Sequence, residues 1–167
     1  TPSQHGAVTY KRYPQKDGFI CSDGHISTIH KPDDKGYWRC KRPGCIGSDG
    51  LPRKSAPSRW ISICTGGHLH PFDYGKWAHT QSNINCPNPF NSEIDVIRGD
   101  SASYTLEGFT VICRLCSASR TMGRVPYLSE NERPTCKGWV PWIGANLIED
   151  CELKMEHKQT SNVSVTF

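Results

Sequence analysis

The chain has 167 residues and a formal net charge of +4, a size that fits one domain or two small ones and excludes a large multidomain enzyme. Leu, Ile, Val and Phe supply 31 of the 167 residues, too few for a conventional hydrophobic core, yet the low net charge argues against intrinsic disorder. The 15 glycines, 12 prolines and 9 cysteines instead indicate a loop-rich fold in which crosslinks replace hydrophobic burial.

The ends of the sequence indicate a piece of a longer polypeptide. The chain begins with Thr1, and its only methionines are Met122 and Met155. Neither a signal peptide nor a membrane-spanning apolar run is visible. We therefore expect a cytoplasmic protein that has no membrane partner.

A short pattern near the start of the chain recurs later. Residues 20–25 read ICSDGH and residues 63–68 read ICTGGH, so an apolar strand end is followed each time by Cys-x-x-Gly-His through a glycine turn. Charge divides with this repeat, since residues 1–59 carry +6 and residues 60–167 carry −2. Residues 47–58, rich in Gly, Ser, Pro and Lys, have the composition of a linker or surface loop. We predict a basic N-terminal module, 1–59, and a larger second module, 60–167.

The second module is predicted to begin with a strand and a helical turn. Residues 60–64 have the pattern of a short strand. Pro71 begins a helical turn that has Asp73 near its N-terminus and Trp77 on its buried side. This turn would carry His79 inward.

The remaining elements are expected to be short. Alternating apolar residues predict β-structure at 94–97 and within 106–113, and residues 117–124 have the composition of a short helix. A last strand is predicted near Asn162, and prolines interrupt the chain before it. The expected fold class is a small irregular α+β domain, β-rich, loop-rich and stapled by zinc.

The cysteine spacing favours metal binding over disulfides. Cys113 and Cys116 form a Cys-x-x-Cys knuckle, and Cys40 and Cys45 enclose four residues; both turns direct two thiolates at one tetrahedral ion. Nine cysteines would leave one thiol outside a disulfide set, and a reducing cytosol disfavours disulfides. We therefore predict two to three Zn²⁺ ions, with a disulfide framework as the alternative.

Structural zinc sites usually take four ligands from two pairs, each pair held by a tight turn. This rule predicts three groups, which together use all nine cysteines and three of the seven histidines. The predicted groups are Cys113, Cys116, Cys136 and Cys151; Cys21, His25, Cys40 and Cys45; and Cys64, His68, His79 and Cys86.

Each group has a competing interpretation. The cysteines of the first group could be separate buried thiols, and His25 could be an exposed residue of its glycine turn. Cys64 could be a small buried hydrophobe, with His68 and His79 in ordinary hydrogen bonds. The chain has no H-E-x-x-H or H-x-E motif, no P-loop and no serine nucleophile elbow. We therefore predict a non-catalytic protein, with a zinc hydrolase as the outside alternative.

The first module also interleaves cations with aromatic residues. Proteins that bind single-stranded nucleic acid use this mixture to neutralise phosphates and to stack bases. The competing interpretation is a solvated surface on which the tryptophan covers a metal site. The candidate nucleic-acid contacts are Trp38, Arg39, Lys41, Arg42, Arg53 and Lys54.

The motifs follow one another in a specific order. Between residues 13 and 163 the order includes CTGGH at 64–68, WAH at 77–79, CRLC at 113–116, PWIG at 141–144 and SNV at 161–163. This order resembles the cysteine-rich region of DrmB, the helicase-associated subunit of the bacterial DISARM anti-phage defence system. The resemblance implies a zinc-bearing part of a protein that associates with a DrmA-like helicase and helps it to engage DNA, single-stranded DNA included.

The resemblance has departures at the first knuckle, at His70 and Pro71, and at residues 159–161. The first knuckle of the family reads C-x-x-C-G, whereas here Gly24 stands at the second cysteine position and His25 follows it. The alternative function is a protein-docking zinc module that makes no direct contact with DNA.

Overall fold

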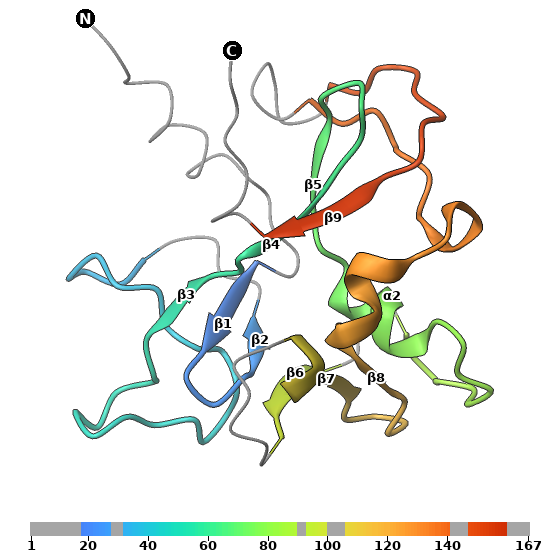
Figure 1. The fold of residues 1–167 in the computed structure, drawn as a ribbon. Coiled ribbons are helices and arrows are strands. Elements are labelled where there is room, and N and C mark those ends of the chain that lie inside the picture. Colours follow the sequence, from blue (N-terminus) through green and yellow to red (C-terminus); the bar gives the residue numbers. More distant parts are fainter. Residues whose placement is uncertain (1–17, 28–31, 90–92, 100–105, 141–146, 160–167) are drawn as a thin grey trace, which may run out of the picture. The chain divides into compact units, whose positions relative to one another are not determined.

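The computed structural model describes residues 18–27, 32–89, 93–99, 106–140 and 147–159. Within them the strands form three antiparallel sheets of three strands each, and helices are short (Figure 1). The predicted fold class, small, irregular and β-rich, is confirmed. Among these residues, no helix is both long and apolar enough to cross a lipid bilayer.

The described residues divide into two compact units. Unit 1 contains residues 59–72, 128–140 and 147–159, and unit 2 contains the others. The predicted boundary at residue 59 therefore coincides with one junction, but residues 73–127 share a unit with the first module. The reason is a direct backbone connection, in which the amide of Val96 donates to the carbonyl of Gly24 over 2.8 Å.

The first sheet of unit 2 has the strand order β2-β1-β3. Its strands are β1 (Phe19–Cys21), β2 (Ile26–Ser27) and β3 (Ser55–Pro57). Residues 55–57 form a strand, because β3 pairs with β1 from Phe19 to Cys21, and the prediction of a linker or surface loop is wrong for these three residues.

The second sheet of unit 2 has the order β6-β7-β8. Residues 117–124 do not form the predicted helix, because Ser119 and Arg120 pair with β7 and a 3-10 helix begins only at Met122. The elements of this part are β6 (Ile94–Arg98), η1 (Leu106–Gly108), β7 (Phe109–Cys113), β8 (Ser119–Thr121) and η2 (Met122–Tyr127).

Helix α2 (Tyr74–His79) packs against β7 and β8, as Figure 1 shows. Its N-cap is Asp73, whose carboxylate accepts from the amide of Lys76 over 2.8 Å, as the predicted place of Asp73 near the N-terminus requires. The prediction that Pro71 begins the turn is wrong, because Pro71 is the last residue of strand β5 (Leu69–Pro71), which pairs with β4 (Trp60–Ile63). Trp77 is buried, and the guanidinium of Arg120 lies 3.8 Å from the centre of its ring. This packing fixes the end of the helix, where His79 lies.

The sheet of unit 1 has the order β5-β4-β9. Phe72, only 1% exposed, contacts the rings of Trp60 and His157. The predicted strand near Asn162 lies outside the described residues. The elements of the unit are β4 (Trp60–Ile63), β5 (Leu69–Pro71), η3 (Glu130–Glu132) and β9 (Glu156–Gln159).

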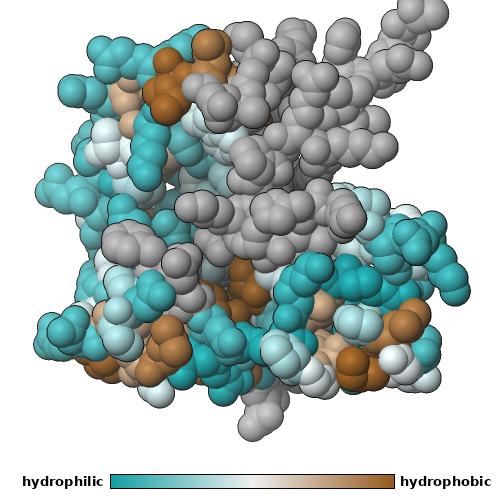
Figure 2. Space-filling view, turned by 180° about the vertical axis from the view of Figure 1, so that it is seen from behind, coloured by the Kyte–Doolittle hydropathy of each residue, from teal (hydrophilic) through white to brown (hydrophobic). Residues whose placement is uncertain are grey.

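Apolar burial is sparse, as the composition predicts. Hydrophilic residues cover most of the described surface in the space-filling view, and exposed apolar side chains form small separate patches (Figure 2). All nine cysteines are buried or half-buried. Three of them, Cys21, Cys40 and Cys45, form a buried cluster of their own. Cysteines therefore make up about a third of the buried apolar residues that the structure describes.

Candidate metal centres

Three groups of side chains converge, and each contains three cysteines and one histidine. Within each group the potential ligand atoms all lie within 4.8 Å of one another. Every cysteine of the chain belongs to one of these groups, and all nine are free thiols. The groups are site A (Cys21, His25, Cys40 and Cys45), site B (Cys64, His68, Cys136 and Cys151) and site C (His79, Cys86, Cys113 and Cys116).

Site A is the group predicted from the sequence, whereas the other two predicted groups exchange their halves. The Cys113–Cys116 knuckle meets His79 and Cys86, not Cys136 and Cys151. The physical reason is the topology of the sheets. Helix α2 packs against the strand that leads into the knuckle, while β9 pairs with β4 and returns the end of the chain to the hairpin of Cys64.

Sites A and B begin with the same hairpin. In site A the amide of Gly24 donates to the carbonyl of Cys21 over 3.0 Å, and the amide of Cys21 donates to the carbonyl of His25 over 3.3 Å. In site B the amides of Gly67 and Cys64 make the equivalent bonds over the same 3.0 and 3.3 Å. The sequence repeat at 20–25 and 63–68 is therefore also a structural repeat.

Both glycines of these hairpins are required by their backbone conformation. Gly24 has φ 82° and Gly67 has φ 84°, the left-handed region that side chains other than glycine rarely adopt. The turn brings the cysteine before it and the histidine after it to the same side, which explains why both repeats contain Cys-x-x-Gly-His.

In sites A and B the third ligand, Cys40 or Cys136, starts a two-stranded ribbon. The amide of Cys40 donates to the carbonyl of Arg53 over 2.8 Å, and the amide of Cys136 donates to that of Leu153 over the same distance. Both cysteine sulfurs also accept a bond from the amide two residues later, over 3.4 Å from Arg42 and 3.2 Å from Gly138. The equivalence thus extends well beyond the hairpin motif.

The ribbons differ in which strand bulges outward. In site A, residues 41–44 bulge from the first strand, and pairing resumes at the bridge between Ile46 and Pro52. In site B, residues 150–152 bulge from the second strand, and pairing resumes where the amide of Glu149 donates to the carbonyl of Gly138. Each bulge adjoins or contains the fourth ligand of its site.

Site C is built differently, from a helix end and a knuckle. The Nδ1 atom of His79 donates to the carbonyl of Gly75 over 2.7 Å, and this bond directs the other ring nitrogen, Nε2, to within 3.3 Å of the sulfur of Cys116. The sulfurs of Cys86 and Cys113 lie 3.9 Å apart. The histidine is thus oriented as a metal-ligating imidazole usually is, by a hydrogen bond at its other nitrogen.

In site B an acidic residue orients the histidine. The Nδ1 atom of His68 lies 3.3 Å from the sulfur of Cys64, and its Nε2 lies 3.1 Å from a carboxylate oxygen of Glu149. First Glu149 and then Cys64 raise the pKa of His68 to about 9. Sequence reasoning missed Glu149; its position two residues before Cys151 is the only signal that the sequence carries.

The pKa values of the buried thiols show why these sites favour a cation. Burial, followed by the crowding of neighbouring thiols, raises the pKa of Cys45 to about 12, and burial raises the pKa of Cys136 to about 12. Burial also acts to raise the pKa of Cys64, but hydrogen bonds from His68 outweigh it and lower the pKa to about 7. A divalent cation would stabilise all of these groups as thiolates.

The spacing of the donor atoms fits a tetrahedral ion. Metal–sulfur bonds of about 2.3 Å place the sulfur ligands of a tetrahedral zinc about 3.8 Å apart. The sulfurs of Cys21 and Cys45 lie 3.9 Å apart, and those of Cys64 and Cys151 lie 4.0 Å apart. The residues present therefore fit the metal that the sequence predicts.

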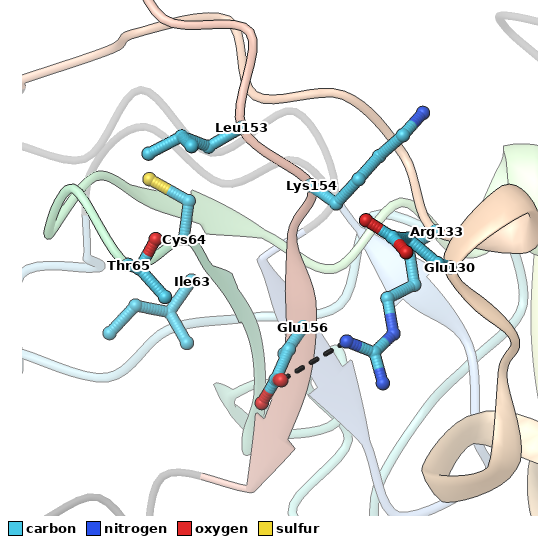
Figure 3. Close-up of a pocket in the computed structure, with 8 residues that line it drawn as sticks. All are labelled: Ile63, Cys64, Thr65, Glu130, Arg133, Leu153, Lys154 and Glu156. Atoms are coloured by element: carbon cyan, nitrogen blue, oxygen red, sulfur yellow. Dashed lines mark hydrogen bonds and ion pairs between the residues drawn. The ribbon is translucent and has the colours of Figure 1, made fainter.

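A pocket of about 340 Å³ opens beside site B (Figure 3). An ion pair of 3.1 Å between Arg133 and Glu156 lies within it, and Lys158 contacts the same carboxylate over 2.7 Å. Lys158 keeps the pKa of Glu156 below its usual value. The lining residues are Ile63, Cys64, Thr65, Glu130, Arg133, Leu153, Lys154 and Glu156.

Most of the candidate nucleic-acid contacts have partners inside the protein. Arg39 pairs with Asp33 over 2.8 Å and with Asp49 over 3.1 Å, and Arg53 pairs with Asp23 over 2.9 Å.

The other candidates differ among themselves. Arg42 pairs with Glu93 and Asp95, and Trp38 stacks on Phe19 with 4.5 Å between ring centres. The ammonium of Lys54 lies 3.6 Å from the centre of the Tyr37 ring, whereas Lys41 is exposed.

Comparison with known proteins gives the chain a family. The family model for a domain of unknown function, DUF8724, matches residues 1–167, so the chain belongs to that family. A search of curated proteins finds no match.

Proposed function

We propose that this member of the DUF8724 family is a non-catalytic scaffold in which three Zn²⁺ ions hold the fold together. The observation that carries the proposal is the convergence of all nine cysteines and three histidines into three sets of four ligands. Zinc is the metal proposed because a tetrahedral set of thiolates and one imidazole is its usual structural site.

A structural role is favoured over hydrolysis by the number and type of ligands. Four protein ligands fill the tetrahedron and leave no position for a reactive water. Glu149, the acid that bonds a ligand of site B, contacts the outer nitrogen of His68, where it orients the ring and does not face a metal-bound water. Among the described residues that line the pocket beside site B, the only thiol is that of the ligand Cys64, and Glu156 is held in an ion pair with Arg133.

The experiment that tests the proposal is native mass spectrometry of the full chain, followed by chelation. The expected mass corresponds to three zinc ions per chain, and a strong chelator is expected to abolish the cooperative thermal transition. A chain that retains its transition without metal, or whose cysteines are joined in disulfides, would overturn the proposal.

For its setting, we propose that the scaffold docks a DrmA-like helicase in a DISARM-like defence complex. The support is the order of motifs that resembles DrmB, together with exposed apolar side chains beside site C. Leu115 within the site C knuckle and Ile84 near Cys86 are each 50% exposed. Docking to protein is favoured over direct DNA contact because acidic residues of this chain already neutralise Arg39, Arg42 and Arg53.

Salt dependence distinguishes docking from DNA binding. If the chain contacts DNA through Lys41, single-stranded DNA affinity should fall log-linearly with salt, and Lys41→Ala should reduce the slope by about 1. The docking proposal predicts weak DNA binding in which Lys41→Ala leaves the slope unchanged. Lys76→Ala, which removes the same charge from helix α2, is the matched control.

A further inference from the structure

Asp95 is a buried acid outside the three ligand sets. It lies on β6, opposite Ile112 of β7, and is only 2% exposed. Because a buried carboxylate loses its hydration, it is stable only where positive charges and hydrogen-bond donors surround it. The partners of Asp95 therefore show what its burial requires.

Both partners come from the metal-binding loops of unit 2. Arg42 lies in the bulge that precedes Cys45 of site A, and its Nη2 lies 2.5 Å from Oδ1 of Asp95. Arg114 lies inside the Cys-x-x-Cys knuckle of site C, and its Nε lies 2.6 Å from Oδ2. One carboxylate thus binds the bulge of site A through Oδ1 and the knuckle of site C through Oδ2.

Backbone hydrogen bonds beside Asp95 link β6 to the same two metal-binding loops. Val96 donates to the carbonyl of Gly24 in the hairpin of site A over 2.8 Å, and the amide of Arg114 donates to the carbonyl of Glu93 over 2.8 Å. Glu93 also pairs with Arg42. Strand β6 therefore lies between the two loops and contacts both.

We propose that Asp95 couples metal binding at sites A and C, so that unit 2 gains or loses its two ions together. This inference rests on the proposed function, because it requires that both sites bind metal. Each arginine is positioned by a loop whose shape its own metal fixes. When one loop opens, its arginine leaves, and the buried carboxylate keeps only half of its counter-charge, which disfavours the closed form of the other loop.

Site B provides an internal reference. Its ligands all belong to unit 1, whereas Asp95 and the arginines that bind it belong to unit 2. The proposal therefore predicts that site B fills independently of Asp95, whereas sites A and C fill over the same range of free Zn²⁺.

The test measures cysteine alkylation, peptide by peptide, while the full chain is titrated with Zn²⁺ in a chelator buffer. Protection of each ligand peptide gives a separate midpoint for each site. Cys45→Ser, which removes a ligand of site A, is expected to raise the free Zn²⁺ needed to fill site C by about tenfold. In Asp95→Asn the midpoint of site C is already raised, and adding Cys45→Ser should shift it no further.

A second variant keeps all ligands and the carboxylate. Arg114 is 52% exposed, so Arg114→Gln removes one arm of the bridge without emptying the interior, and it should uncouple the two sites as Asp95→Asn does. Glu156→Gln, which breaks an ion pair in unit 1, should leave both midpoints unchanged.

The outcomes separate the two proposals. If Cys45→Ser leaves site C unchanged, or shifts it equally with and without Asp95→Asn, the coupling through Asp95 is overturned while the metal scaffold stands. If Zn²⁺ protects none of the three sites, the proposed function itself is overturned, and the coupling with it.

Discussion

Sites A and B share one backbone framework but take their fourth ligand from opposite strands of it. In both, a Cys-x-x-Gly-His hairpin supplies two ligands and a ribbon supplies the other two. The fourth ligand of site A, Cys45, ends a bulge in the first strand of its ribbon, whereas Cys151 of site B lies in a bulge of the second strand. The two sites thus have the same composition with different ligand spacing.

This difference shows what a tetrahedral ion constrains. The ion requires four donor atoms at fixed positions in space, and it is indifferent to the strand that carries them. A bulge on either strand of a paired ribbon can bring a thiol to the same place. The first three ligands are placed by the shared framework, and the fourth is free to come from either strand.

The largest expected effect is the loss of the third ligand, a cysteine at the equivalent position of each site. Metal binding carries on the order of 10 kcal/mol of folding free energy in small zinc domains, so Cys40→Ser should unfold unit 2 and Cys136→Ser should unfold unit 1. Hydrogen-exchange mass spectrometry measures this unit by unit. Each variant is the control for the other, and loss of protection in both units from either variant would contradict the assignment of sites to units.

The hairpin glycines give a smaller effect that differs between the sites. Both adopt positive φ, so an alanine costs about 1 kcal/mol at either position. At Gly24 a Cβ would also lie 2.0 Å from the carbonyl oxygen of Val96, whereas at Gly67 it meets no atom within 4 Å.

Gly24→Ala should therefore destabilise unit 2 by roughly 3 kcal/mol or more, and Gly67→Ala should destabilise unit 1 by about 1 kcal/mol. Denaturant unfolding followed by hydrogen exchange gives both values. Equal losses would mean that β6 does not press against the site A hairpin.

The smallest effect concerns Nε2 of His68 and His25, the ring nitrogen that does not face a ligand sulfur. Glu149 orients His68, whereas Nε2 of His25 has no protein partner among the residues that the structure describes. Removing such a partner typically weakens metal binding by about tenfold, so Glu149→Gln should weaken Zn²⁺ binding at site B by that factor and leave site A unchanged. Glu152→Gln, the same change at an exposed acid nearby, is the control; equal effects of the two variants would remove the role given to Glu149.

The sequence was sufficient for the fold class and for the set of cysteines and histidines that converge in the three groups. Low aliphatic content with many cysteines predicted a metal-stapled, β-rich fold, and close pairs such as Cys21 with His25 were found because a tight turn fixes their geometry. Asp73 and Trp77 predicted the helix that carries His79.

Spacing could not show which pairs meet. The prediction placed Cys136 and Cys151 together correctly but joined them to the Cys113–Cys116 knuckle. They meet Cys64 instead because β9 pairs with β4, which a local motif does not record. The same holds for Arg42, whose charge indicated a phosphate contact although its partner is a buried acid on a distant strand.

The central claim is that three sites of one composition, three sulfurs and one nitrogen each, hold the metal ions. Cadmium NMR of the fully substituted chain tests this directly, because the chemical shift of a bound cadmium ion depends mainly on the number of its sulfur ligands. The account predicts three resonances, all in the range of three sulfurs and one nitrogen. Resonances typical of four sulfurs and of two sulfurs with two nitrogens, or fewer than three resonances, would contradict it.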